Sequence, residues 1–190
     1  MAYLVSFALL VAVLAWMVGV YNNLEHLRGV VCSCWGQWRL ATHRRNVCLA
    51  DFVSVFAVLL PRGDPLPREL RRMVEDSERS LALALEPRWN GNAGMLAGAE
   101  SILRRAVAQS VQLVEDSPQM RQHEQLLQLC SSMSVSLYQQ EQVEALFDHA
   151  AYEYNAALVT PSARLLGPLF GFAKADPLAP VARQQKTRSS

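Results

Sequence analysis

The feature that most constrains this chain is a long apolar segment at its N-terminal end. Residues Ala2–Leu24 read AYLVSFALLVAVLAWMVGVYNNL, and no charged side chain occurs before Glu25. At a helical rise of about 1.5 Å per residue, the most apolar part, Tyr3–Val20, can nearly cross a hydrocarbon layer roughly 30 Å thick. The segment therefore predicts a single transmembrane helix, and residues 1–24 form the expected anchor.

Aromatic side chains lie at both ends of this apolar segment. Trp16 and Tyr21 lie toward its downstream end, and Tyr3 lies near its start. Amphipathic rings favour the boundary between lipid and water, so these positions are typical of the two ends of a span. We therefore expect Tyr3, Trp16, Val20 and Tyr21 to contact the bilayer.

A cleaved signal peptide is the competing interpretation of the same segment. The tripeptide Val13-Leu14-Ala15 follows a short apolar region and resembles a processing site. However, no basic side chain precedes the apolar run, and the run continues for five residues beyond Ala15. Both departures from the signal pattern favour a retained anchor.

The charges beside the span indicate which side of the membrane the rest of the chain occupies. Arg28 and Arg39 follow the span, with Arg44 and Arg45 slightly further on, whereas no basic side chain precedes it. Because Lys and Arg near a span are retained on the cytoplasmic side, we expect the bulk of the chain to be cytoplasmic.

The composition includes enough hydrophobic residues for the core of one folded unit, and the near-zero net charge argues against a strongly charged partner. Of the 190 residues, 51% are hydrophobic, which is ample for a core. The 18 basic and 17 acidic residues leave a net charge of +1, so no large electrostatic field attracts nucleic acid. We therefore expect no nucleic-acid partner.

Beyond the span, apolar residues recur at helical spacing and no strand-like alternation appears. Steps of three and four residues dominate two sets: Val20, Leu24, Leu27, Val31, Trp35 and Trp38, then Leu49, Phe52, Phe56 and Leu59. No proline occurs before Pro61, so the membrane helix is predicted to continue into the domain as one rod. The polar cluster Thr42–Asn46 is the place where we expect this rod to change packing partners.

Turn signals divide the remaining chain into further helices. Pro61–Pro67 predicts a turn in which Asp64 caps the next helix, and Glu86-Pro87 is predicted to end that helix. Ser117-Pro118 predicts the start of another helix. The Gln- and Glu-rich stretch 138–146 predicts a more solvated part of the last long helix.

The predicted fold is all-α, with an N-terminal transmembrane helix that continues into an antiparallel bundle of long helices. The bundle domain is predicted over residues 25–172. Residues 173–190 are rich in Pro, Gln and Arg, and they predict a disordered C-terminal tail.

No constellation typical of metal binding is evident. Cys32, Cys34, His43 and Cys48 lie within one stretch, but a continuous helix cannot bring four such ligands together. Cys32 and Cys34 point in different directions on a helix, which disfavours a disulfide between them and suits a reducing compartment.

No catalytic constellation is evident either. The HEQLLQ motif at His123 has Leu127 where a zincin requires its second His. Asp148 and His149 are adjacent, so they diverge on a helix, and we interpret them as part of a solvated face. We expect no enzyme activity, no cofactor, no metal and no small-molecule substrate.

Three stretches carry a resemblance to a known family. VYNNLEHLRGVVCSCWGQW follows the span, LVEDSPQMRQHEQLLQL lies in the middle, and AYEYNAALVTPSARLLGPLFGF lies near the end. Their order resembles the LemA family of bacterial membrane-anchored helical proteins, and the resemblance covers most of residues 1–172. The matching positions are Tyr21-Asn22, Ser117-Pro118, the run Leu126–Leu129, Tyr154-Asn155 and the hook Phe170-Gly171-Phe172.

The resemblance implies a helical domain tethered to the bacterial cytoplasmic membrane by a single span, and it names no activity. One segment departs from the family pattern. Relatives typically read Arg-x-Asp-Leu-Ile-Pro-Asn-Leu-Val, whereas Arg45–Val53 reads RNVCLADFV and lacks the Asp and the Pro at those positions. Without that Pro, the rod is expected to be straighter here.

The C-terminal stretch raises the question of what it packs against. We expect Tyr154 to point inward, its hydroxyl and Asn155 to satisfy polar groups near a helix end, and Phe170-Gly171-Phe172 to fold back over the bundle. The alternative is a hook exposed for docking to a neighbouring subunit or to lipid. Trp35 and Trp38 are further candidate interaction residues, provided that they are exposed.

These observations favour a membrane-anchored interaction or scaffold protein whose partners are the lipid bilayer and either a second protein or further copies of the chain. Two alternatives remain open at this point. One is a regulatory subunit or an enzyme of the cell envelope with a sparse site. The other is a lipid-remodelling oligomer.

Overall fold

The computed structural model describes residues 2–87, 89 and 94–178. Within these residues, five α-helices and two 3-10 helices follow one another: α1 (Ala2–Leu59), α2 (Leu66–Leu83), α3 (Gly94–Asp116), η1 (Met120–Gln122), α4 (Glu124–Leu158), α5 (Pro161–Leu166) and η2 (Gly167–Phe170). The described residues form no β-sheet, and their one isolated bridge joins Trp89 to Ala175. The all-α prediction is therefore confirmed.

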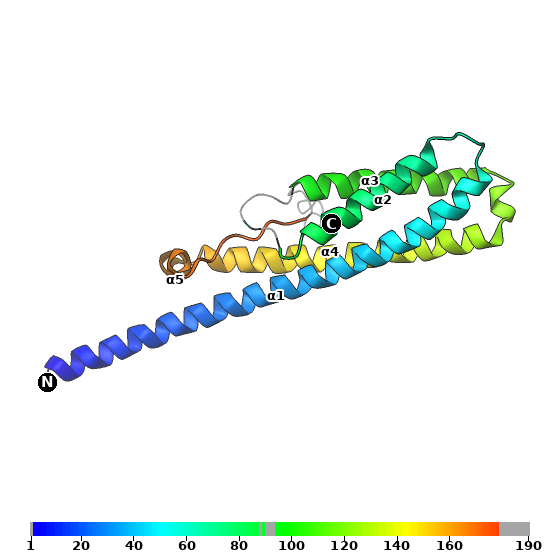
Figure 1. Ribbon diagram of the computed structural model, residues 1–190. Coiled ribbons are helices and arrows are strands. Elements are labelled where there is room, and N and C mark those ends of the chain that lie inside the picture. Colours follow the sequence, from blue (N-terminus) through cyan, green and yellow to red (C-terminus); the bar gives the residue numbers. More distant parts are fainter. Residues whose placement is uncertain (1, 88, 90–93, 179–190) are drawn as a thin grey trace.

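Helix α1 runs without interruption for 58 residues. Its N-terminal part projects beyond the other helices, whereas its C-terminal part packs among them (Figure 1). The absence of proline allows this continuity, because each backbone N–H can reach the carbonyl four residues earlier. The predicted long rod is thus present.

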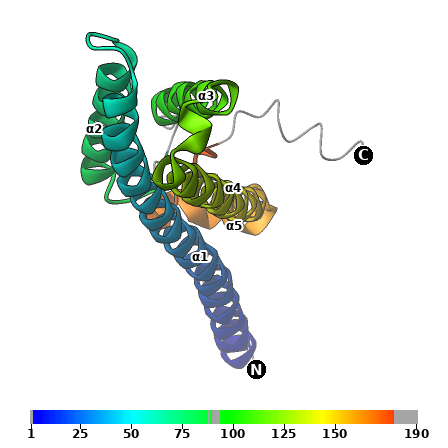
Figure 2. The same cartoon turned by 90° about the vertical axis from the view of Figure 1, so that its right-hand side faces the viewer.

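Helices α1 and α4 lie side by side along much of their length (Figures 1 and 2). Their contacts occur in opposite order along the two helices. Cys48 lies by Ser136, at 3.6 Å between Sγ and Oγ, and the ring centroids of Trp35 and Phe147 are 5.3 Å apart. The two helices therefore run in opposite directions.

Helices α2 and α3 cover the part of the α1–α4 pair that lies away from the N-terminus (Figure 1). In the turned view, α2 lies on one side of α1, and α3 and α4 lie on the other (Figure 2). Short α5 lies at the end of α4 that is nearer the N-terminus of α1 (Figure 1).

Two apolar clusters form the core, one at each end of the packed region. The cluster nearer the free end of α1 contains Val31, Trp35, Trp38, Leu81, Ala84, Phe147, Ala150, Ala151, Tyr154, Ala175 and Leu178. The other contains Leu49, Phe52, Val53, Phe56, Leu70, Val74, Leu103, Val107, Val114, Met120, Leu126 and Met133. Between them lie the buried polar residues of the cluster Thr42–Asn46, so this segment marks the change from one core to the next.

The turn between α1 and α2 follows the predicted chemistry. Gly63 adopts φ +98°, which an L side chain rarely adopts, and the Asp64 carboxylate accepts the Leu66 N–H at 2.9 Å. Helix α2 ends at Leu83, three residues before the predicted Glu86-Pro87 stop. The helix stops early because Ala84 leaves helical geometry, and its carbonyl accepts the indole N–H of Trp35 at 3.2 Å.

The prediction that a helix starts at Ser117-Pro118 is wrong. Helix α3 ends at Asp116, residues Met120–Gln122 form a 3-10 turn, and α4 begins at Glu124. His123 is the cap instead, since its Nδ1 accepts the Leu126 N–H at 3.3 Å. The 3-10 turn places the side chain of Met120 in the second core cluster.

Residues 173–178 belong to the packed unit, in contrast to the predicted tail over residues 173–190. Ala175 and Leu178 are buried in the first cluster. The Leu178 N–H donates to the Asp148 carboxylate at 2.7 Å, so Asp148 is buried and not part of a solvated face. The rest of the predicted tail, residues 179–190, lies outside the described residues.

Candidate functional site

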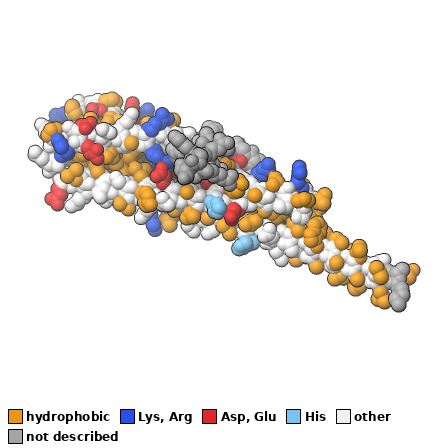
Figure 3. Space-filling model, turned by 180° about the vertical axis from the view of Figure 1, so that it is seen from behind, with side chains coloured by type: hydrophobic (Ala, Val, Ile, Leu, Met, Phe, Trp, Pro, Cys, Tyr) orange, Lys and Arg blue, Asp and Glu red, His pale blue; other side chains and the backbone are white. Residues whose placement is uncertain are grey.

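The N-terminal part of α1 presents apolar side chains on every side. No residue in its most apolar 18-residue window is buried, and among the described helices α1 alone is long and apolar enough to cross a membrane. Figure 3 shows this arm as a tapering, almost entirely apolar projection, whereas Arg, Lys, Asp and Glu side chains gather over the bundle. An exposed apolar surface of this extent is typical of a segment that contacts a membrane or another protein.

The four predicted bilayer residues lie along this arm and at its base. Tyr3 is 91% exposed, and Trp16 is also exposed. Val20 is half-buried, and Leu24, one turn further, is fully buried. Tyr21 therefore stands where the free arm of α1 meets the packed bundle.

The C-terminal hook, Phe170–Phe172, contacts this junction. The ring of Phe170 lies 5.1 Å from that of Tyr21 in an edge-to-face arrangement, and the ring of Phe172 lies 5.8 Å from it. Gly171 adopts a left-handed conformation with φ +71°, and the Phe172 N–H returns to the Gly167 carbonyl at 3.0 Å. The hook thus packs against α1 at the base of the free arm.

Asn155 holds the chain that follows the hook. Its Nδ2 donates to the Ala175 carbonyl at 2.7 Å, and its Oδ1 accepts the Ala175 N–H at 2.9 Å. One side-chain amide therefore pairs with both polar groups of one backbone residue. This bonding is the polar role that the sequence predicts for Asn155.

Three other predicted interaction residues are buried. Trp35 and Trp38 are each 2% exposed and stack with ring centroids 4.9 Å apart. Tyr154 is buried beside Trp89, and within the described part of the chain its hydroxyl has no hydrogen-bond partner. Neither tryptophan presents a surface to a partner, because both lie on the stripe of α1 that faces the core.

A buried polar network joins all four long helices at the boundary between the two cores. Its centre is Arg45, which is 1% exposed and forms an ion pair with Glu100 of α3. The Arg45 guanidinium also donates to Gln140 Oε1 of α4 at 2.9 Å and to Ser77 Oγ of α2 at 3.2 Å. Asn46 accepts from the same guanidinium at 2.6 Å.

The remaining polar atoms around Arg45 are satisfied within the same network. Gln140 Nε2 donates to Thr42 Oγ1 and to Glu100 Oε2, both at 3.2 Å, and Ser77 Oγ donates to Glu100 Oε1 at 2.9 Å. Burial by itself raises the pKa of Glu100, but hydrogen bonds and charge from Arg45, with help from Gln140 and Ser77, outweigh it and hold that pKa below its ordinary value. The carboxylate is therefore charged at neutral pH.

The spacing of residues in the sequence contains a signal for this network. The positions Trp38, Thr42, Arg45, Leu49, Phe52 and Phe56 form one continuous stripe of three- and four-residue steps. Gln140 falls in a seven-residue series on α4 whose members are all buried: Leu126, Met133, Gln140, Phe147 and Tyr154. The prediction that residues 138–146 are more solvated is therefore wrong for Gln140, which faces Arg45.

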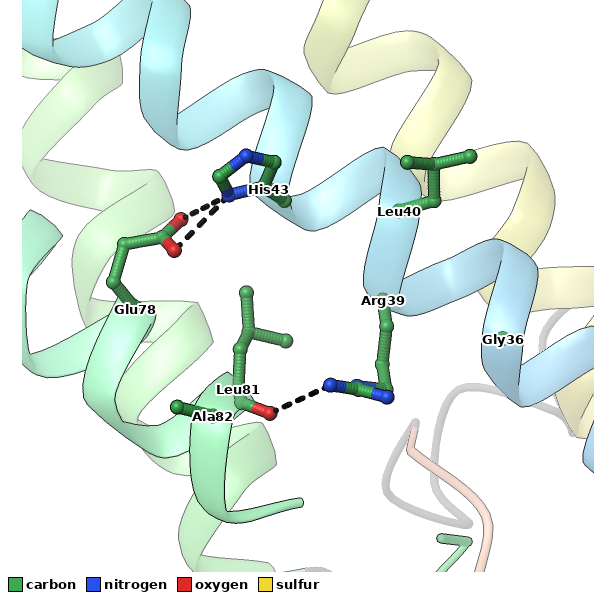
Figure 4. Close-up of a pocket in the computed structure, with 7 residues that line it drawn as sticks. All are labelled: Gly36, Arg39, Leu40, His43, Glu78, Leu81 and Ala82. Carbon is green, nitrogen blue, oxygen red and sulfur yellow. Dashed lines mark hydrogen bonds and ion pairs between the residues drawn. The ribbon is translucent and has the colours of Figure 1, made fainter. Parts of the chain in front are cut away.

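A shallow groove of about 360 Å³ lies between α1 and α2 (Figure 4). Arg39 reaches across it to the Leu81 carbonyl at 3.2 Å, and His43 Nδ1 lies 3.0 Å from the Glu78 carboxylate. Arg39 Nε has no hydrogen-bond partner among the described residues, and Leu40 and Ala82 complete the wall of the groove. The groove brings together no nucleophile and base of the kind that catalysis uses.

Three of the four cysteines have a thiol that burial makes less reactive. Burial raises the pKa of Cys32, Cys34 and Cys130, which favours the neutral thiol over the nucleophilic thiolate. Across residues 2–87, 89 and 94–178, no three His, Cys, Asp or Glu side chains are placed to hold a metal ion.

In comparisons with known proteins, the chain matches no protein-family model, no curated protein and no solved structure. Its function is therefore inferred from its own residues and fold. Two features stand out: the bare apolar arm of α1, and the junction at Tyr21 where that arm meets the bundle and the hook.

Proposed function

We propose that this chain is a single-pass, membrane-anchored scaffold of the LemA type, with an antiparallel helical bundle on the cytoplasmic face of a bacterial membrane. The observation that carries the proposal is the exposed apolar arm of α1, in which no residue of the most apolar window is buried. A helix that is apolar all round and unpacked is accounted for by a lipid environment.

The bundle is suited to presenting a rigid surface away from the bilayer. Helix α1 enters it without a break, the contacts with α4 run in opposite order along the two helices, and the Arg45 network ties α2 and α3 to both. The groove at His43 pairs no nucleophile with a base, and burial disfavours the reactive thiolate of Cys32, Cys34 and Cys130. A binding role fits these observations better than catalysis does.

Membrane anchoring is tested by expressing the full chain with a C-terminal tag and washing the membranes at alkaline pH. We expect the chain to remain in the membrane pellet at its uncleaved mass of 21.2 kDa. Protease added to inverted vesicles should then remove the bundle, and protease added outside intact cells should not. A shorter chain in the supernatant would support a cleaved signal peptide instead.

The scaffold role is tested by brief crosslinking in cells, extraction in mild detergent and measurement of the mass and composition of the particle. A large particle that contains only this chain supports self-association, and a stoichiometric second protein supports an adaptor. A bare monomer would contradict the scaffold role and favour the sparse-site alternative, which a bound small molecule or metal would support. Leakage of loaded liposomes would support the lipid-remodelling alternative.

A further inference from the structure

The segment formed by α5 and η2, residues 161–170, is apolar on two opposite faces. Its inner face packs on the bundle through Ala163, Leu166 and Gly167, which are all buried. Its outer face carries Leu165 and Leu169, which are 70% and 75% exposed. A surface segment is normally polar on the outside, so the outer face lacks a partner within the described chain.

The location of this outer face identifies the partner that it fits. Phe170, which follows Leu169, is itself exposed and packs edge-to-face on Tyr21. Tyr21 marks the end of the free apolar arm of α1. Figure 1 shows α5 at the end of the bundle from which the arm projects. The outer leucines therefore lie at the level where the proposed span leaves the bilayer.

The charges of the segment agree with a lipid surface. From Val159 to Lys174 the sequence contains Arg164 and Lys174 and no acidic residue, and both cations are exposed. An apolar face bordered by basic side chains is the pattern of elements that lie in the interface and attract anionic headgroups. The large side chains of the segment, Leu and Phe, are those that insert between lipid chains.

We propose that residues 161–170 form a second membrane contact, in which Leu165, Leu169 and Phe170 insert into the interfacial layer of the bilayer that α1 spans. This inference rests on the proposed anchoring of α1. A bilayer is favoured over a second copy of the chain because the face is continuous with the arm through the Tyr21–Phe170 contact. Two contacts on one bilayer fix the tilt of the bundle, which a single span leaves free.

The test uses the full chain with its four native cysteines replaced by alanine, and one new cysteine carrying an environment-sensitive fluorophore. The positions are Leu169→Cys in the segment, Leu10→Cys in the arm and Val58→Cys at the far end of α1, where Val58 is as exposed as Leu169. Each protein is reconstituted in phosphatidylcholine–phosphatidylglycerol vesicles containing lipid with a quencher near the headgroup or deep in the chain. Circular dichroism confirms equal helicity of the three variants.

We expect shallow-quencher lipid to reduce emission at residue 169, deep-quencher lipid to reduce it at residue 10, and neither to affect residue 58. Quenching at residue 10 without quenching at residue 169 would overturn the second contact and leave the anchor intact. Quenching at residue 169 alone would overturn the span. A probe at residue 169 that is shielded from water, unquenched by lipid and crosslinked to a second copy would show that the face binds protein.

Discussion

The two parts of α1 lie in one unbroken helix, yet they differ in what covers them. From Tyr3 to Val20 the side chains are apolar on all sides, and none is buried over the most apolar window. From Leu24 to Phe56 one stripe of the helix is buried, and the stripe includes the charged residue Arg45. A helix in lipid needs no stripe because its surroundings are uniform, whereas a helix in a bundle has one face toward a core.

The two parts of α1 also differ in whether they contain charged side chains. The arm contains no charged side chain, as a helix that spans a bilayer requires, and this agrees with the proposed anchoring. The packed part buries Arg45, because α2, α3 and α4 each supply a partner. If α1 spans a bilayer as we propose, a charge in the arm would prevent insertion, whereas the charge in the bundle is held by specific partners, and variants can separate these two roles.

The largest effect is expected when charge is added to the arm. Leu10→Arg combined with Val13→Arg should prevent stable insertion, since each Arg near the centre of a span costs about 2.5 to 3.5 kcal/mol. The melting temperature of the bundle should not change, because both side chains are exposed on the arm and belong to neither core cluster. Alkaline washing followed by quantification of pellet and supernatant measures the effect. Leu83→Arg, at an exposed leucine of α2, is the control and should remain in the pellet.

Removal of the buried charge from the packed part is expected to lower the stability of the bundle and to leave membrane retention unchanged. Arg45→Leu leaves Glu100 buried without its ion-pair partner, so the free energy of unfolding should fall by about 3 to 5 kcal/mol. Membrane retention should be unaffected. Denaturant unfolding in detergent gives the value, and Arg44→Leu, an exposed neighbour on the same helix, should change it by less than about 0.5 kcal/mol. Equal losses in the two variants would argue against the network.

Acid should weaken the packed part by a smaller amount. Because the folded state lowers the pKa of Glu100 below its ordinary value of 4.5, the contribution of this carboxylate is complete above that pH. It is lost as the pH falls below 4.5 through the lower folded pKa, since the unfolded chain binds the proton first. The stability of Glu100→Gln should therefore depend less on pH in this range, and the exposed Glu115→Gln should follow the parent chain.

The smallest effect is expected at the junction of the two parts. Tyr21→Leu retains apolar volume but removes the ring contacts with Phe170 and Phe172, so the free energy of unfolding should fall by about 0.5 to 1.5 kcal/mol. Hydrogen exchange should increase in residues 161–172 and not in α2. The exposed Tyr138→Leu on α4 is the matched control, and equal exchange in both variants would contradict a role for Tyr21 in holding the hook.

The sequence predicted those parts of the fold that depend on local signals. The helical periodicity, the proline-free length of α1 and the Asp64 turn each follow from residues close together in the chain. The burial of Arg45 and Gln140 depends on which helices meet, and their partners lie 55 and 95 residues apart in the sequence. The three- and four-residue steps through Thr42 and Arg45 place both residues on the buried stripe of α1. The polarity of the two side chains conceals this signal, because polar residues usually lie on the surface.

The C-terminal end was harder to predict for a different reason. Residues 173–178 have no periodic pattern, and their position depends on hydrogen bonds to Asn155 and Asp148 of α4. A side chain that binds the backbone of a distant segment leaves no trace in that segment's own residues. Trp35 and Trp38 lie on the apolar stripe of α1, and their burial follows from that position. They are therefore not exposed contacts for a partner.

The continuity of α1 has a mechanical consequence. With no hinge between Tyr3 and Leu59, a displacement of the arm along its axis is transmitted to Arg45 without loss. A shift of one helical turn, about 5.4 Å, would separate the Arg45 guanidinium from the Gln140 amide and leave a buried ion uncompensated. If the arm is anchored in a bilayer as proposed, the Arg45 network would oppose movement of α1 along its own axis, and a force on the anchored end would be resisted inside the bundle.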